Sequence, residues 1–301
     1  MSNTVTKTPS PQVAQFKKNA RRFFRSWSSG LALIAFILLV LAAIFAPYLS
    51  AQNPYNLQSL SIMDGNLPPG SQAFDGMVFL LGSDDQGRDL YSAILYGLRI
   101  SLVVGLSAAF LAFAIGSVIG LLAAYLGGRA ETFIMRLVDL QLSFPTILLA
   151  LLLIALLGKG ISNVIIAIVL VEWAIYARTA RGAALSEIRR DYMDAGRGLM
   201  LPSWRLVLVH LLPNCLSPLV VLLTMQIARA ITLEATLSFL GLGVPITQPS
   251  LGLLIANGFS FMMSGSYWIS FFPGIALLIV VYSINVIGDR LRQILNPKEV
   301  R

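Results

Sequence analysis

Residues 191–214 read DYMDAGRGLMLPSWRLVLVHLLPN, a polar stretch that lies between strongly apolar runs. The runs LLLIALL (151–157) and VIIAIVLV (164–171) precede it, and LVVLLTMQIA (219–228) follows it. A polar break of this length between apolar runs indicates a loop that leaves the apolar environment and returns to it.

The break carries a helical pattern of its own. Met193, Arg197 and Met200 have the spacing of residues that share one face of a helix. Leu201 precedes Pro202, and a residue before proline avoids the α region, whereas proline itself is accepted in the first turn of a helix. The sequence therefore predicts a short helix, a turn just before Pro202, and a second helix that returns to the apolar region.

Composition shows which solvent surrounds the apolar runs. The chain has 301 residues, of which 56% are hydrophobic and only 12% are charged. Soluble domains carry about 25% charged residues, so the solvent around most of this chain is lipid. The single cysteine, Cys215, and the single histidine, His210, exclude a disulfide framework and a Cys-rich or multi-His metal site. We expect an all-α polytopic membrane protein.

Six apolar runs are long enough to cross a bilayer, which takes about 20 residues of helix. The first run is too long for a signal-peptide core and is expected to be retained. The predicted spans are 30–50, 98–126, 132–157, 161–180, 212–238 and 268–288. The predicted organisation is a tail at 1–29, a first transmembrane helix at 30–50, an outside segment at 51–97, a five-helix core at 98–290 containing a cytoplasmic loop at 181–211, and a tail at 291–301.

The basic residues predict the orientation. With the N-terminus in the cytoplasm, all of the 22 Lys and Arg residues lie on the inside except Arg88, Arg99, Lys159 and Arg229. Cytoplasmic loops carry an excess of Lys and Arg, so both termini are predicted to be cytoplasmic. The net charge of +8 is thus a topology signal, and we expect a membrane lipid environment and no nucleic-acid partner.

The polar break also resembles a known motif. Permease subunits of bacterial ABC importers, which reside in the inner membrane, carry the pattern E-A-A-x3-G-x9-I-x-L-P in a cytoplasmic loop. Asp194, Ala195, Gly196 and Met200 match its first part, and His210, Leu212 and Pro213 match the rest. In that family the loop is a coupling helix that docks on the ATPase subunit.

The resemblance implies a set of ATPase-coupling residues: Glu187, Arg189, Arg190, Asp191, Asp194, Ala195, Gly196, Met200 and Pro202. Met200 stands where the family has glycine, and a methionine does not readily adopt a positive φ. Our hypothesis is that Leu201 and Pro202 make the turn by another route.

Four further stretches resemble the dipeptide, oligopeptide and nickel branch of these permeases. They are LGSDDQGRDLYSAILYGLRISLVVG (81–105), YLGGRAETFIMRLVDLQLSFP (125–145), LEATLSFLGLG (233–243) and FFPGIALLIVVYSINVIGDRLRQILNP (271–297). The resemblance implies a type I ABC importer permease fold of the branch's second permease type. It also implies a second homologous permease, two ATPase subunits and a periplasmic substrate-binding protein as partners. The implied cargo is short peptides, or alternatively nickel chelates, opines or other peptide-like solutes.

The chain lacks the G-x4-GK[ST] phosphate loop, so ATP and Mg are expected on partner ATPase chains and no cofactor on this one. Charged residues inside spans are costly, and we expect Glu172, Arg229 and Glu234 to line the translocation path. Arg229 and Glu234 are five residues apart, so they point to different faces of their helix. The segments 49–97 and 246–267 are expected to be loops that contact the binding protein.

Two other functions are compatible with parts of the sequence. A self-contained secondary transporter would also have six spans and a few buried charges, but it needs no coupling loop, and no inverted repeat is visible. An intramembrane serine protease would pair Ser107 with His210, but the predicted topology keeps them more than about 10 Å apart along the membrane normal.

Overall fold

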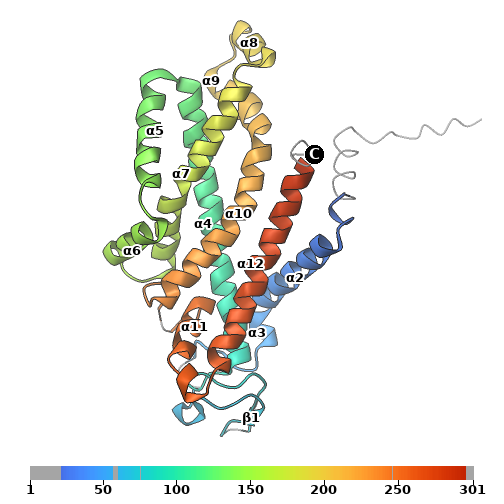
Figure 1. Cartoon of the computed structure of the whole chain (residues 1–301), viewed down its shortest axis with the longest axis vertical. Coiled ribbons are helices and arrows are strands. Elements are labelled where there is room, and N and C mark those ends of the chain that lie inside the picture. Colours follow the sequence, from blue (N-terminus) through green and yellow to red (C-terminus); the bar gives the residue numbers. More distant parts are fainter. Residues whose placement is uncertain (1–21, 57–59, 75, 246, 296–301) are drawn as a thin grey trace, which may run out of the picture.

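Long apolar helices dominate the computed structural model, which describes residues 22–56, 60–74, 76–245 and 247–295. Five of its helical stretches are long and apolar enough to cross a membrane, and the count reaches six if a bent pair is taken as one span. The five stretches are α2 (Trp27–Ile44), α4 (Leu90–Leu126), α7 (Ile161–Glu187), α10 (Leu212–Phe239) with the helical residues before it, and α12 (Trp268–Leu295). In Figure 1 they run lengthwise through the molecule, with α2 inclined to the rest.

The third predicted span, 132–157, is wrong as a continuous helix. It consists of α5 (Gly128–Leu142) and α6 (Thr146–Leu157), which meet at an angle of 93°. Pro145 stands at the N-cap of α6 with extended backbone. Because proline lacks an N–H and disfavours the α region for Phe144 before it, the helix ends at the break and restarts in a new direction.

Two boundaries near the outside segment also differ from the predicted ones. The predicted span at 98 begins instead at Leu90, because Asp89 caps the helix by accepting a hydrogen bond from the Ser92 N–H at 2.9 Å. The stretch 246–267, predicted as a loop, contains the helix α11 (Leu251–Phe259) and the 3-10 turn η4 (Met262–Ser264). Ser250 caps α11 through the Leu253 N–H at 3.3 Å.

The other predicted helices agree more closely with the structure. The predicted span 30–50 corresponds to α2 and the short α3 (Ala46–Leu49), and the span 161–180 continues to Glu187. The spans 212–238 and 268–288 correspond to α10 and α12, although α12 runs on to Leu295. The tails beyond 22 and 295 lie outside the described residues.

The segment before α4 forms a small folded unit at one end of the bundle, the hairpin end, at the bottom of Figure 1. The strands β1 (Ser71–Gln72) and β2 (Val78–Phe79) pair antiparallel, after the 3-10 turn η2 (Ile62–Asp64). Its buried centre is the ion pair between Arg88 Nε and Asp84 Oδ2 at 2.9 Å. Burial raises the pKa of the Asp84 carboxyl, although the Arg88 guanidinium acts to lower it. The two short strands, with an isolated antiparallel bridge between Ser83 and Asp89, depart from an all-α fold.

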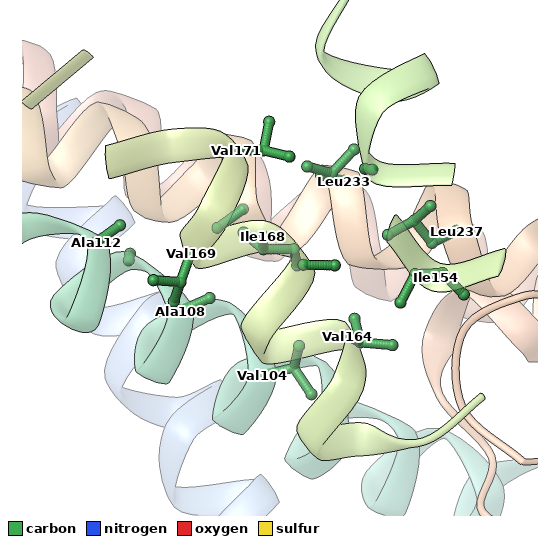
Figure 2. Packing of buried hydrophobic residues seen from close by; sticks show 14 of the residues in the cluster. Val104, Ala108, Ala112, Ile154, Val164, Ile168, Val169, Val171, Leu233 and Leu237 are labelled. Atoms are coloured by element: carbon green, nitrogen blue, oxygen red, sulfur yellow. The ribbon is translucent and has the colours of Figure 1, made fainter. Parts of the chain in front are cut away.

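The centre of the bundle is the contact between α4 and α7, here called the α4–α7 seam. Figure 2 shows Val104, Ala108 and Ala112 of α4 spaced along one face, with Val164 and Ile168 of α7 beside them. Small side chains let the two backbones approach closely, as is common between helices in membranes.

Two glycines mark the tightest points of the α4–α7 seam. A Cβ on Gly116 would overlap the carbonyl oxygen of Trp173, and one on Gly120 would overlap that of Ala177. Glycine at both positions therefore permits the close approach of the two helices. Helices α4 and α7 are therefore held in a fixed register relative to each other.

Candidate coupling loop and buried polar residues

The polar stretch at 188–205 lies at the other end of the bundle, the loop end, where α8 extends beyond the long helices at the top of Figure 1. It contains α8 (Asp191–Gly198) and α9 (Ser203–Arg205), and the π-helical turn η3 (Leu206–Leu211) leads into α10. The predicted order of short helix, turn and returning helix is confirmed. Pro202 stands one position before α9, and its carbonyl accepts the first helical bonds from Arg205 and Leu206.

Met200 makes the turn at the end of α8. Its φ is +53°, in the left-handed region that glycine occupies most easily. The Leu201 N–H donates to the Gly196 carbonyl at 3.2 Å, and the Met200 N–H donates to the Arg197 carbonyl at 2.9 Å. This is the pair of bonds of a Schellman motif. The hypothesis that the turn avoids a positive φ at Met200 is therefore wrong, because the methionine takes the glycine conformation itself.

A few contacts anchor α8 to the bundle. Met193 is fully buried, in a hydrophobic cluster with residues of α4, α7, η3 and α10. Gly196 is also buried, and a Cβ there would lie 2.6 Å from Leu206 Cδ2, so an alanine would press on the buried Leu206. Glycine at this position brings α8 close to η3.

Glu187 fixes the start of the loop. The residue is 8% exposed, and its carboxylate pairs with Arg190 Nη2 at 3.0 Å and accepts a hydrogen bond from the Tyr192 hydroxyl at 3.0 Å. Partial burial and the bond to Glu187 raise the pKa of Tyr192 to about 12. Glu187 thus positions α8 relative to α7 and offers little surface of its own.

The predicted coupling residues divide into two groups. Glu187 and Gly196 are buried and hold the loop in place. The others are exposed: Arg189, Arg190, Asp191, Asp194, Ala195, Met200 and Pro202. The expectation that Met193, Arg197 and Met200 share one face is wrong, since Met193 is buried, Arg197 is exposed, and Met200 lies beyond the last turn of α8.

The exposed side of α8, together with Leu199 and Met200, is here called the α8 face. It carries the two negative charges of Asp191 and Asp194 and the positive charge of Arg197, with Ala195 and the apolar Leu199 among them. Leu199 is 75% exposed and Met200 is 91% exposed. Exposed apolar side chains with charges around them, at the tip of a projecting loop, are typical of a protein–protein contact.

Pro213 stands in the first turn of α10, directly after η3. Proline cannot donate to the carbonyl four residues earlier, and the chain before it widens into η3. Within this turn the Leu212 N–H bonds to the Val207 carbonyl, and the Asn214 side chain donates to the His210 carbonyl at 2.7 Å. The carbonyls of Val207 and His210 therefore have hydrogen-bond partners despite the proline.

Glu234 is enclosed at the junction of three helices. It is fully buried on α10 and accepts hydrogen bonds from Ser101 Oγ of α4 and from Ser238 Oγ, both at 2.7 Å. The Leu251 N–H at the start of α11 reaches the same Ser101 hydroxyl at 3.4 Å. Glu234 therefore joins α4, α10 and α11, and it does not line an open path in this structure.

Glu172 has a different environment. It is 3% exposed on α7, yet neither of its carboxylate oxygens has a hydrogen-bond partner among the described residues. The hydroxyl of Tyr176, one turn further along, and Nε2 of the buried Gln226 on α10 are likewise unpaired within the described chain. Glu172 interacts electrostatically with Arg229. An unpaired buried carboxylate inside a span is costly, which makes Glu172 a candidate functional residue.

Arg229 lies in a groove at the break between α5 and α6. The groove has a volume of about 400 Å³ and is lined by Pro145, Thr146, Ile147, Arg229, Thr232, Leu233 and Thr236. Arg229 Nη2 donates to Thr146 Oγ1 at 3.1 Å, and the guanidinium is exposed. Arg229 does not contact Glu234, which agrees with the prediction that they point to different faces.

The threonines of this groove were not predicted. Thr232 lies three residues after Arg229, and Thr236 lies four residues after Thr232. The two threonines therefore share the face of α10 that carries Arg229. That spacing was visible in the sequence, whereas the contribution of Thr146 depends on the bend between α5 and α6.

The fold and the loop together define a class: a multi-pass helical membrane protein with a short helix projecting from one end of the bundle. Residues 116–301 match the family described as "binding-protein-dependent transport system inner membrane component", and residues 15–69 match the "N-terminal TM domain of oligopeptide transport permease C". The chain belongs to this family of inner-membrane transport components.

Relatives and a solved structure agree with this assignment. The chain is 40% identical over 279 residues to a putative peptide transport system permease protein of Brucella suis, covering 93% of this chain and 90% of the relative. It is 39% identical over 267 residues to the di/tripeptide transport system permease protein DppC of Pseudomonas aeruginosa, covering 88% and 86%. A chain of the MetNI methionine ABC transporter in an inward-facing conformation shares the fold, with a TM-score of 0.55 and 22% identity over 67% of this chain and 96% of that one. The fold is that of a type I ABC importer permease.

Proposed function

We propose that this chain is the transmembrane permease subunit of an ATP-driven, binding-protein-dependent importer, and that the α8 face is its contact with an ATPase subunit. The observation that carries the proposal is a short helix that is anchored by Glu187, Met193 and Gly196 but presents the rest of its surface outward. Such a helix can transmit a displacement of a docked partner to α7 and α10, to which it is joined.

The loop end is proposed to face the cytoplasm. The arginines of the polar stretch, among them Arg189, Arg190 and Arg197, all lie at this end. An excess of Arg at one end is the usual mark of the cytoplasmic side. This orientation puts the α8 face where ATP is available and puts the hairpin end on the periplasmic side.

The chain is proposed to be a non-catalytic subunit. Its sequence has no phosphate loop, so ATP and Mg would be bound and ATP hydrolysed by two partner ATPase chains. A second, homologous permease would complete the membrane part. A periplasmic substrate-binding protein would meet the hairpin end, where β1, β2 and the segment after α11 are exposed in part.

Short peptides are the proposed cargo. The support is the sequence identity of about 40% to proteins named as peptide permeases. The Arg229 groove adds a physical reason, because an exposed guanidinium beside hydroxyl groups can attract the carboxylate end of a peptide. Glu172 would become the matching acidic group when α7 and α10 separate during alternating access. Glu234, held by Ser101 and Ser238, would act by joining helices instead.

Two measurements test the proposal. The tagged full-length chain, extracted in mild detergent from its native membranes, should bring with it a second permease, ATPase chains and a binding protein, all identified by mass spectrometry. Cells lacking the chain should lose uptake of labelled di- and tripeptides and regain it from a plasmid copy. Uptake by this chain alone, driven by an ion gradient and indifferent to ATP, would contradict the proposal and favour a secondary transporter.

A further inference from the structure

An apolar groove opens at the loop end between the start of α2, α10 and α12. Its volume is about 550 Å³. Phe23 and Phe24 lie on one side, Leu216 and Val220 on the second, and Leu291 and Ile294 on the third. Volumes of this size accommodate drug-sized apolar ligands. None of these six side chains carries a charge, so the groove itself attracts apolar chains only.

Arginines stand next to two sets of groove-lining residues in the sequence. Arg22 and Arg25 flank the two phenylalanines, and Arg290 and Arg292 flank Leu291. Asp289 is the one acidic residue next to them within the described chain, so the positive charge predominates. Arg22, Arg25 and Arg292 are exposed. An apolar groove bordered on one side by guanidinium groups matches a molecule with an anionic head and apolar tails.

Arg290 shows that this border is built into the fold. Its Nη1 donates to Gln293 Oε1 at 2.9 Å, and its Nη2 donates to the backbone carbonyl of Arg22. Through these bonds α12 holds the segment before α2 over the groove. Nε of Arg290 is buried and has no hydrogen-bond partner among the described residues, which leaves one donor of this guanidinium unused.

We propose that the groove is a binding site for an anionic phospholipid. The acyl chains of the lipid contact Leu216, Val220 and Leu291, and its phosphate lies among the arginines. Basic pockets between transmembrane helices favour anionic head groups over zwitterionic ones. A helix of a second protein would bury several guanidiniums without a matching charge, which is costly. The proposal requires only that the chain spans a membrane. It does not depend on the cargo or on the proposed orientation.

The first test measures lipid retention by native mass spectrometry. The full-length chain, with whatever assembles with it, is placed in nanodiscs of phosphatidylglycerol or phosphatidylcholine with identical acyl chains and then released into detergent. We expect phosphatidylglycerol to remain bound in preference to phosphatidylcholine. The double variant Arg22→Gln/Arg25→Gln should lower this preference by about 25-fold, at about fivefold per arginine. The side chains of this pair form no ion pair within the described residues, so the variant is expected to fold.

The control is Arg129→Gln, which removes an exposed arginine at the same end of the bundle but away from the groove. It should keep the lipid preference of the unchanged chain. Equal retention of the two lipids, or equal loss in the control and the double variant, would overturn the proposal.

A second variant tests the apolar part of the site. Val220→Trp should fill the groove and reduce retention of phosphatidylglycerol while the elution volume and melting temperature stay near those of the unchanged chain. Full lipid retention in this variant would contradict the assigned groove. Cross-links from Val220→Cys to another protein chain, rather than to lipid, would also overturn the proposal. Free phosphate, added as a competitor, distinguishes a site for the head group alone from a site for the whole lipid. At millimolar concentration it should displace no bound phosphatidylglycerol.

Discussion

The α4–α7 seam and the α8 face are built in opposite ways. In the seam, Gly116 and Gly120 leave no room even for a methyl group, because backbone carbonyls of α7 lie against them. The α8 face is exposed, and α8 depends on Met193, Gly196 and the Glu187 contacts for its position. The difference suggests a division of labour, in which the seam keeps a fixed register while α8 receives a partner and moves with η3.

The largest effect is expected from adding bulk to the seam. Gly120→Leu would drive a side chain into the Ala177 carbonyl, a backbone group that cannot rotate away. Overpacking commonly costs about 1–3 kcal/mol, and contact with backbone puts this variant at or above the upper end. The yield of monodisperse protein and its melting temperature measure the effect.

The matched control is Gly182→Leu on α7, where a Cβ has nothing within 4 Å. It should leave yield and melting temperature nearly unchanged. Equal behaviour of the two variants would show that the α4–α7 seam is no tighter than the rest of the bundle.

A smaller effect is expected from the two buried carboxylates. Glu234→Ala leaves the Ser101 and Ser238 hydroxyls without their acceptor and should destabilise the fold by about 1–3 kcal/mol. Glu172→Gln removes a charge whose oxygens have no hydrogen bond to lose among the described residues, so stability should stay the same or rise. Thermal unfolding in detergent compares them. If Glu172→Gln proved the more destabilising of the two, the distinction between the sites would fail.

The next effect concerns function rather than stability. Ala195→Arg adds a large charged side chain to the α8 face without touching its buried anchors. If the face docks an ATPase subunit, transport should fall by about 30-fold, the size of an interface hot spot of about 2 kcal/mol, while the melting temperature stays constant. Ser186→Arg, exposed on α7 outside the α8 face, is the control and should transport normally.

The smallest effect is expected at the turn. A non-glycine residue in the left-handed region costs about 1–2 kcal/mol, so Met200→Gly should relieve strain and raise the melting temperature slightly. Leu199→Gly, at a position with ordinary negative φ, should lower it slightly. If Met200→Gly destabilised the protein more than Leu199→Gly, the result would contradict the assignment of a Schellman turn at Met200.

Hydropathy and proline placement predicted most of the fold. The long helices α4, α7, α10 and α12 were found because unbroken apolar runs of about 20 residues have few alternatives to a spanning helix. The break before Pro145 was missed because the residues around it are apolar enough to keep the average high. Helix α11 was missed for the opposite reason, since its nine residues are too few for a span and lie between glycine- and proline-containing stretches.

The candidate site was predicted in part. The helix–turn–helix order of the loop followed from Pro202, but the conformation of Met200 did not, because the Schellman bonds from Met200 and Leu201 override the intrinsic preference of methionine. The three charges at Glu172, Arg229 and Glu234 were visible as residues. Their different environments depend on Ser101 and Thr146, which are distant in sequence and come close only in the folded chain.

The central claim is that the α8 face contacts an ATPase subunit, and cysteine cross-linking tests it most directly. The single natural cysteine is buried, so Cys215→Ala provides a background without reactive thiols. In that background, Leu199→Cys in the assembled complex should give an adduct between this chain and an ATPase chain with a short bifunctional reagent. Met193→Cys, whose side chain is buried, should give none. A Leu199→Cys chain that labels freely with a small maleimide in the intact complex, yet never cross-links to an ATPase, would contradict the account.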